Sequence, residues 1–199
     1  MTFRVLSVCT GNVCRSPFAA QLLAARLAAW GVDAEVTSAG THAMVGHAMT
    51  PEAAEMSLRA GVDPGAHRAR QLTAEMIDDA DLVLVASREH RAAVLQVSPR
   101  ASRRTFTYRE FARIAEFVAA ESAADPTFAY PRDARALVEE VAASRGLAVP
   151  PGRPEDDDVV DPYRRSPEVY AEAERLITVA VDGVVRAFTA TASGGRGAA

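Results

Sequence analysis

Lysine is absent from this sequence of 199 residues, and cysteine occurs only twice, as Cys9 and Cys14. Arginine therefore supplies all 22 basic side chains, against 26 acidic ones, and the formal net charge is -4. The arginines are scattered along the chain, so nothing resembles the basic surface of a nucleic-acid-binding protein. Two cysteines are too few for a disulfide framework or a four-thiolate metal site, and a reducing cytoplasm is the expected setting.

Long apolar stretches are also missing. No run approaches the roughly 20 residues that cross a bilayer, and the opening MTFRVLSV lacks the apolar segment of a signal peptide. We therefore expect no membrane span. No cluster of His and Asp has the spacing of metal ligands, so we expect neither a metal nor another cofactor.

The first half of the sequence alternates strand and helix patterns. Helical patterns cover residues 17–30, 51–60 and 88–97, and apolar β-type runs cover residues 3–8, 34–37, 82–86 and 105–108. This order predicts an α/β, Rossmann-like fold with a four-stranded, parallel, twisted sheet and helices on both faces. Ligands of such sheets bind at the carboxyl ends of the strands, and residues 9–16 follow the first strand.

The length and the 49% hydrophobic content suit one domain, which we place at residues 1–190. Two amphipathic helical segments, joined by SAADPTFAYP and followed by a loop rich in Pro, Gly and acids, form a predicted helical insertion at about 112–157. A last long helix is expected at 167–189, and residues 191–199 are predicted to be a flexible tail. We expect a monomer.

The turn after the first strand reads VCTGNVCRS, residues 8–16, with five residues between Cys9 and Arg15. A loop of this length can wrap a tetrahedral anion with inward backbone N–H groups and the positive end of the next helix. Arg15 can hold two anion oxygens with its planar guanidinium, and the same positive field favours the thiolate form of Cys9. A thiolate below a bound oxyanion is placed for in-line attack on phosphorus.

The residue types inside this loop fit the same interpretation. Gly11 is expected to allow a backbone conformation that a Cβ would hinder, and Asn12 tolerates left-handed geometry. The loop contains no GxxxxGK[ST] nucleotide motif and no CxxC redox pair, because four residues separate the two cysteines. The predicted phosphate-binding residues are Thr10, Gly11, Asn12, Val13, Cys14, Arg15 and Ser16.

VCTGNVCRSP resembles the signature of the low-molecular-weight protein tyrosine phosphatases. The segments TSAGT (37–41), HRARQLT (67–73), DADLVLVAS (79–87) and DPY (161–163) resemble further family segments, in family order. The resemblance covers most of the sequence, and the region 112–157 departs from it.

The resemblance implies a reaction. The chain is expected to hydrolyse phosphotyrosine in protein substrates through a cysteinyl-phosphate intermediate and to bind phosphate-like oxyanions. Ester cleavage needs a general acid on a loop over the anion site, and the chain offers Asp156, Asp157, Asp158 and Asp161. Asp161 precedes a proline and matches the family's general acid, so it is the predicted acid and base.

The remaining site residues are carried over in the same way. Ser16 is expected to hydrogen-bond the thiolate, and Ser38 and His67 to support the loop together with Asn12. The pocket wall is assigned to Tyr163, followed here by Arg164 rather than a second aromatic residue, and to Met44, with His42 as its alternative. Cys14 is the expected redox partner of Cys9, and the alternative is a buried thiol at the start of the helix without such a role.

Three other functions stay open. Protein arginine phosphatases have a similar loop, but they typically carry Thr where this chain has Val13. Arsenate reductases relay electrons through further cysteines, and none follows Cys14. A phosphate-binding module without turnover would be expected to lack Cys9, Arg15 or Asp161, and all three are present.

Overall fold

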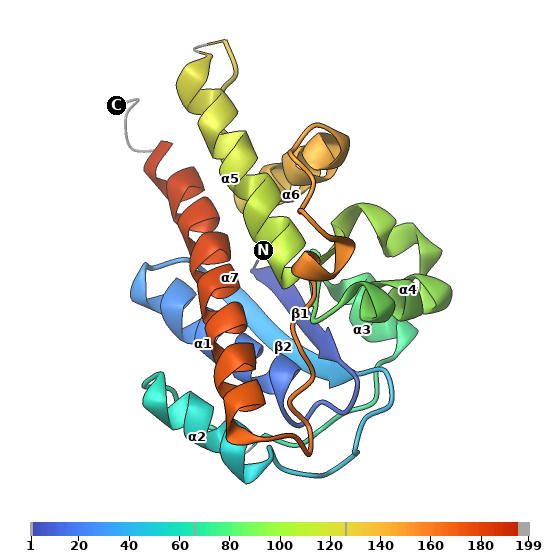
Figure 1. Ribbon diagram of the computed structural model, residues 1–199. Coiled ribbons are helices and arrows are strands. Elements are labelled where there is room, and N and C mark those ends of the chain that lie inside the picture. Colours follow the sequence, from blue (N-terminus) through green and yellow to red (C-terminus); the bar gives the residue numbers. More distant parts are fainter. Residues whose placement is uncertain (1, 66, 126, 195–199) are drawn as a thin grey trace.

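A four-stranded parallel sheet forms the centre of the molecule, as predicted (Figure 1). The computed structural model describes residues 2–65, 67–125 and 127–194. The strand order is β2-β1-β3-β4, and the strands are β1 (Phe3–Cys9), β2 (Ala34–Gly40), β3 (Leu82–Val85) and β4 (Thr105–Thr107).

Helices connect the strands and follow the last one. They are α1 (Arg15–Ala29), α2 (Pro51–Arg59), α3 (Ala74–Asp79), α4 (Arg88–Val97), α5 (Tyr108–Ala124), α6 (Ala134–Ala143) and α7 (Pro167–Gly194). Short 3₁₀ turns lie at η1 (Pro99–Arg104), η2 (Ser144–Gly146) and η3 (Pro154–Asp157). A Ser, Thr or Asp side chain accepts a backbone N–H at the start of each helix from α2 to α6, whereas α1 has no such cap.

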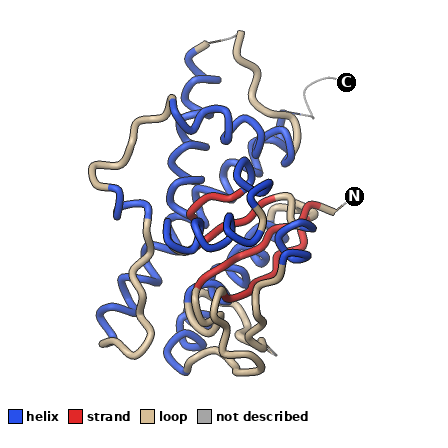
Figure 2. The backbone as a smooth tube through the Cα atoms, turned by 90° about the vertical axis from the view of Figure 1, so that its right-hand side faces the viewer, coloured by secondary structure: helices blue, strands red, loops and turns tan. Residues whose placement is uncertain are grey.

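Helices cover both faces of the sheet. Because side chains alternate along each strand, each strand contributes residues to a core on either face. Phe3 and Val5 of β1 join a core with α1, α5 and α7, and Leu6 and Val8 point the other way into a core with α3 and α4. Figure 2 shows the strands between these two layers. Helices α5 and α7 pack against each other and extend together beyond the sheet (Figure 1).

The strand order fixes where a ligand can bind. From β1 the chain turns to one side to form β2 and then crosses over to form β3 on the other side of β1. The carboxyl ends of β1 and β3 therefore border a crevice from which the connections leave in opposite directions. The nonapeptide that follows β1 lies at this point.

The chain's final segment differs from the prediction. Helix α7 continues to Gly194, so the predicted tail is wrong for residues 191–194, and residues 195–199 lie outside the described part. Thr191 is buried and donates a hydrogen bond from its hydroxyl to the carbonyl of Phe188, which holds the added turn. The predicted division into one domain with an insertion at 112–157 stays a prediction; within that region α5 packs on α7 through Ile114 and Val118.

Candidate active site

The loop between β1 and α1 forms a cup whose carbonyl groups point outward. The carbonyls of Cys9, Thr10, Gly11 and Val13 accept N–H groups of Thr41, His42, Met44 and Thr50 at 2.9–3.0 Å. The carbonyl of Asn12 contacts Nε2 of His67 at 2.7 Å. Because the N–H of a trans peptide points opposite to its carbonyl, these five peptides direct their N–H groups toward the cup.

Asn12 holds this loop from inside the protein. Its backbone is left-handed (φ 55°) and it is fully buried. Its side-chain amide donates to the hydroxyls of Ser16 and Ser38, each at 2.9 Å, and accepts the N–H of Arg70 at 2.9 Å. The structure thus brings the three predicted supporting residues, Asn12, Ser38 and His67, together and adds Ser16 to their network.

Gly11 does not need the conformational freedom expected of it. Its φ is not positive, and an added Cβ would lie 3.4 Å from Cγ2 of Val13 and 3.9 Å from Met44, which are ordinary contacts. The left-handed residue of the loop is its neighbour Asn12. A Cβ on Gly11 would point toward Met44, and both residues line the same pocket.

Cys9 and Arg15 lie on the floor and the rim of the cup. The Sγ of Cys9, a residue 3% exposed, lies 3.0 Å from the hydroxyl of Ser16. The guanidinium of Arg15 is also buried; its Nη1 donates to the carbonyl of Val159 at 3.1 Å, and its Nη2 lies 3.0 Å from Oδ2 of Asp161. The contact with Val159 thus fixes one nitrogen of Arg15, and the nitrogen that pairs with the Asp161 carboxylate can bind another anion in its place.

Asp161 stands at the mouth of the site with its carboxylate exposed. One oxygen pairs with Arg15, and the other accepts the N–H of Tyr163 at 3.3 Å. The other aspartates before it are not free: Asp156, Asp157 and Asp158 pair with Arg153, Arg113 and Arg88. Of these four carboxylates, Asp161 is the one that pairs with Arg15 in the part of the chain that the structure describes.

A cavity of about 160 Å³ opens above the cup. Tyr163 and Met44, the two residues assigned to the pocket wall, line it, and so does His42, the alternative to Met44. The remaining lining residues are Cys9, Thr10, Gly11, Val13, Cys14, Arg15 and Asp161. Ring and thioether side chains over a positive floor suit an anion carried on an apolar group.

Burial changes the protonation of two groups in this region. Burial raises the pKa of the Cys14 thiol, although hydrogen bonds with Thr50 and Tyr170 oppose the shift. Burial also lowers the pKa of His67, and Arg70 and Arg68 act in the same direction. Cys14 is therefore a thiol at neutral pH, and His67 is a neutral ring.

The structure adds residues that the sequence interpretation missed. Ser7 donates its hydroxyl to the carbonyl of Ser16 at 2.7 Å and contacts the buried hydroxyl of Tyr108. His90, at the start of α4, contacts the Thr10 hydroxyl through Nε2 at 2.8 Å. The contact partners of Tyr108 and His90 are 101 and 80 residues away, so no local pattern indicates these roles.

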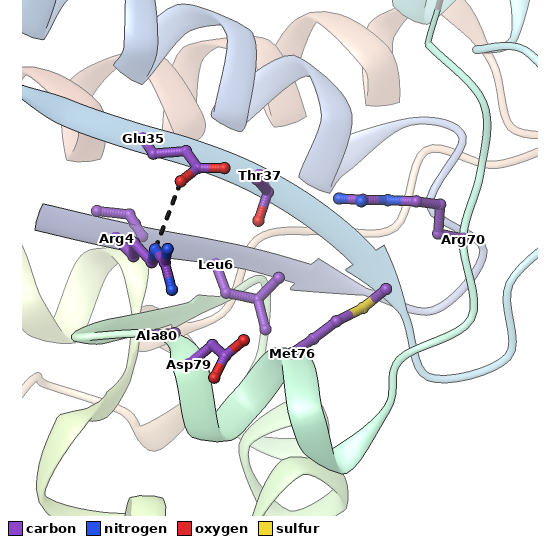
Figure 3. A pocket seen from close by; sticks show the side chains of 9 residues that line it. Arg4, Leu6, Glu35, Thr37, Arg70, Met76, Asp79 and Ala80 are labelled. Atoms are coloured by element: carbon purple, nitrogen blue, oxygen red, sulfur yellow. Dashed lines mark ion pairs between the residues drawn. The ribbon is translucent and has the colours of Figure 1, made fainter. Parts of the chain in front are cut away.

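A second pocket, of about 280 Å³, lies away from the cup, on the sheet face that α3 covers. Arg4 and Glu35 form an ion pair at 3.5 Å at one end, and Arg70 lies at the other (Figure 3). Arg70 donates to the carbonyl of Ser38, so this pocket borders the network behind the cup. Among the described residues no group of three His, Cys, Asp or Glu side chains could hold a metal ion, and no helix could span a membrane.

A cysteine sulfur buried beneath converging N–H groups, next to an Arg–Asp pair, is the arrangement that suits a cysteine-based phosphatase on a doubly wound sheet. The family model described as low molecular weight phosphotyrosine protein phosphatase matches residues 4–145. The chain belongs to this family.

Several relatives and solved structures are similar to the chain. The low molecular weight protein-tyrosine-phosphatase Etp of Escherichia coli is 40% identical over 107 residues, which cover 54% of this chain and 70% of the relative. A protein-arginine-phosphatase of Geobacillus stearothermophilus is 40% identical over 111 residues, covering 56% and 72%. The crystal structure of the low molecular weight protein tyrosine phosphatase from T. tengcongensis has a TM-score of 0.66 and 30% identity, covering 93% of this chain and 99% of that one.

Proposed function

We propose that this chain hydrolyses phosphotyrosine in proteins, with Cys9 as nucleophile, Arg15 as phosphate ligand and Asp161 as general acid and base. The observation that supports this best is the placement of Cys9 Sγ in a cup of N–H groups whose mouth holds the Arg15–Asp161 pair, at 3.0 Å. Each group has the chemistry that its place requires.

The reaction proceeds in two steps. The phosphate dianion replaces the Asp161 carboxylate as partner of Arg15, while the contact with Val159 keeps the guanidinium in place. The Cys9 sulfur attacks phosphorus, the P–O bond to the aryl oxygen breaks, and protonated Asp161 gives its proton to that oxygen. Asp161 then takes a proton from water, which attacks the cysteinyl phosphate and releases phosphate and the Cys9 thiolate.

Two substitutions test the roles of Cys9 and Asp161. Cys9→Ser is expected to abolish turnover of a phosphotyrosine peptide yet still to bind phosphate in calorimetry, because the cup remains. Asp161→Ala is expected to lower kcat by about 10²–10⁴, the usual contribution of general acid–base catalysis. Asp156→Ala, which removes an exposed carboxylate paired with Arg153, is the matched control and should retain activity. A near-normal rate for Asp161→Ala would remove this residue from the mechanism.

The second candidate function is hydrolysis of phosphoarginine, because a relative named protein-arginine-phosphatase is as similar to this chain as Etp is. Val13 and the ring of Tyr163, which both line the pocket, favour a flat aryl phosphate over a guanidino phosphate. Initial rates with p-nitrophenyl phosphate, a phosphotyrosine peptide and phosphoarginine separate the two. A higher kcat/KM for phosphoarginine would replace the first candidate with the second.

We also propose that the protein works as a cytoplasmic monomer without metal or other cofactor. A reducing compartment keeps Cys9 and Cys14 free, and the cup supplies its own positive charge. Activity that survives EDTA, and a monomeric mass in light scattering, are the expected results.

A further inference from the structure

His90 is a buried ring that the mechanism above does not use. It is 5% exposed, and both ring nitrogens contact hydroxyl groups: Nδ1 that of Ser87 at 2.7 Å, and Nε2 that of Thr10 at 2.8 Å. Burial, and next to it the charge of Arg15, lower the pKa of His90 to about 4. A neutral imidazole has one donor and one acceptor, and a hydroxyl can take either role, so both contacts are satisfied hydrogen bonds.

Thr10 is the first residue of the cup after the nucleophile. Its carbonyl accepts the N–H of His42 at 3.0 Å, while its side chain is bound to His90 on the other side. The peptide that joins Thr10 to Gly11 is therefore restrained by both hydrogen bonds. The N–H of this peptide, which belongs to Gly11, is one of the donors that face the cup. The hydrogen bond from His90 to Thr10 therefore helps to orient a donor of the anion site.

The same short segment also holds the loop that carries Asp161. The N–H of Arg88 donates to Oδ1 of Asp158 at 2.8 Å, and the Arg88 guanidinium pairs with Oδ2 at 3.0 Å. One residue further, the N–H of Val159 donates to the carbonyl of Ala86 at 2.8 Å. Three residues beyond Asp158, the carboxylate of Asp161 reaches Arg15.

We propose that the β3–α4 junction, residues 86–90, positions both halves of the active site. His90 is a positioning residue for the cup through Thr10, and Arg88 with Asp158 is a positioning pair for the general-acid loop. The proposal rests on the proposed function, because it assigns the two contacts to two different parts of that reaction. It predicts that loss of the His90 contact weakens anion binding, whereas loss of the Asp158 contact slows substrates with poor leaving groups.

The His90 contact is tested through anion binding and through coupling to Thr10. His90→Phe fills the volume of the ring without hydrogen bonds, and His90→Gln keeps a polar group that can reach Thr10. We expect His90→Phe to lower kcat/KM for p-nitrophenyl phosphate about tenfold and to weaken vanadate inhibition in parallel, as loss of the hydrogen bond to Thr10 implies. We expect His90→Gln to recover most of the loss.

A double-mutant cycle separates this role from a general loss of structure. If His90 acts through Thr10, the combined variant Thr10→Val with His90→Phe is no slower than His90→Phe alone. Additive losses, or a His90→Phe rate within twofold of the original chain, would contradict the assignment. Should His90→Phe fail to fold, Thr10→Val breaks the same hydrogen bond from the exposed side and gives the same readout.

The Asp158 contact is tested through the leaving group. Phenolate needs the proton of Asp161 far more than p-nitrophenolate does, so a displaced acid loop slows phenyl phosphate selectively. We expect Asp158→Ala to lower kcat/KM, which reports on the step in which the leaving group departs, about fivefold more for phenyl phosphate than for p-nitrophenyl phosphate, with vanadate inhibition unchanged. Asp156→Ala, on the same loop, is the control and should leave this ratio unaltered. Equal losses with both substrates would overturn the assignment.

The proposed function and the positioning role of residues 86–90 can fail separately. If the original chain hydrolyses none of the aryl phosphates, the proposed function is wrong, whereas phosphate binding to the His90 variants, measured by calorimetry, still tests the cup contact. If the original chain is active and neither substitution has its specific effect, the positioning role alone is wrong.

Discussion

Asn12 combines two demands in one residue. Its left-handed backbone favours Gly or Asn, and its buried amide satisfies Ser16, Ser38 and the N–H of Arg70. Asn12→Gly should lower the free energy of unfolding by about 2–3 kcal/mol, because buried partners are left unsatisfied. Asn12→Ala should lose a further ~1 kcal/mol or more through backbone strain. Urea unfolding measures both, and equal stability of the two variants would show that conformation plays no part in the choice of Asn.

Cys14 is predicted to protect Cys9 from over-oxidation. Peroxide converts Cys9 to a sulfenic acid, and the thiol of Cys14 condenses with it to a disulfide with release of water. We expect peroxide inactivation to be reversed by dithiothreitol in the original chain and to be largely irreversible in Cys14→Ser. Because burial raises the pKa of Cys14 and the thiolate is the attacking form, the protected fraction should grow as the pH rises. Unchanged reversibility in Cys14→Ser would refute the role.

Which site residues are predictable depends on how far apart their partners lie in the chain. The cup residues from Cys9 to Ser16 are contiguous, so their spacing alone indicates an anion site. His90 and Asp158 act through partners 80 and 70 residues away, and their roles depend on the sheet that brings β1, β3 and the acid loop together. Local sequence can also mislead. The glycine at position 11 suggests an unusual backbone conformation there, but the left-handed residue of the loop is Asn12.

At the scale of elements, the contact between α5 and α7 depends on Gly183. A Cβ added there would lie 2.8 Å from Cβ of Ala112, closer than carbon atoms pack. We expect Gly183→Ala to lower the free energy of unfolding by about 1–2 kcal/mol, since overpacking outweighs the gain in helix propensity. Gly146→Ala, where the added atom meets nothing within 4 Å, is the matched control. Thermal unfolding that is equal for both variants would contradict tight packing of the two helices.

The elements themselves were largely predictable, and the differences have local causes. All four strands were expected, but β2 continues beyond the predicted end at residue 37, because Ser38–Gly40 pair with Ser7–Cys9 of β1. Helix α3 was missed, since it spans only six residues and contributes one buried residue, Ile77, to the core. Hydrophobic patterns in the sequence indicate which residues are buried. The end of β2 depends instead on its pairing with β1, and the start of α3 depends on capping by Thr73.

For the whole molecule, the buried His90 and the half-buried His67 predict a loss of stability in mild acid. The pKa of His90 falls from 6.5 to about 4 on folding, and that of His67 shifts in the same direction. As the pH falls through about 6.5, the unfolded chain takes up protons that the folded chain refuses, so the free energy of unfolding decreases. His90 alone accounts for a loss on the order of 3 kcal/mol, complete near pH 4 and constant below it.

Comparison with a variant isolates this contribution from that of the carboxylates, which titrate in part of the same range. The stability advantage of the original chain over His90→Gln should be largest above pH 6.5 and shrink steadily toward pH 4, because glutamine does not titrate. Urea unfolding at half-unit pH intervals gives this difference curve, and the ring carbon shifts of His90 in NMR spectra should stay those of a neutral imidazole down to about pH 5. A difference that does not vary with pH would mean that folding leaves the pKa of His90 unchanged, and a difference that grows toward low pH would mean that the folded state holds the ring as a cation.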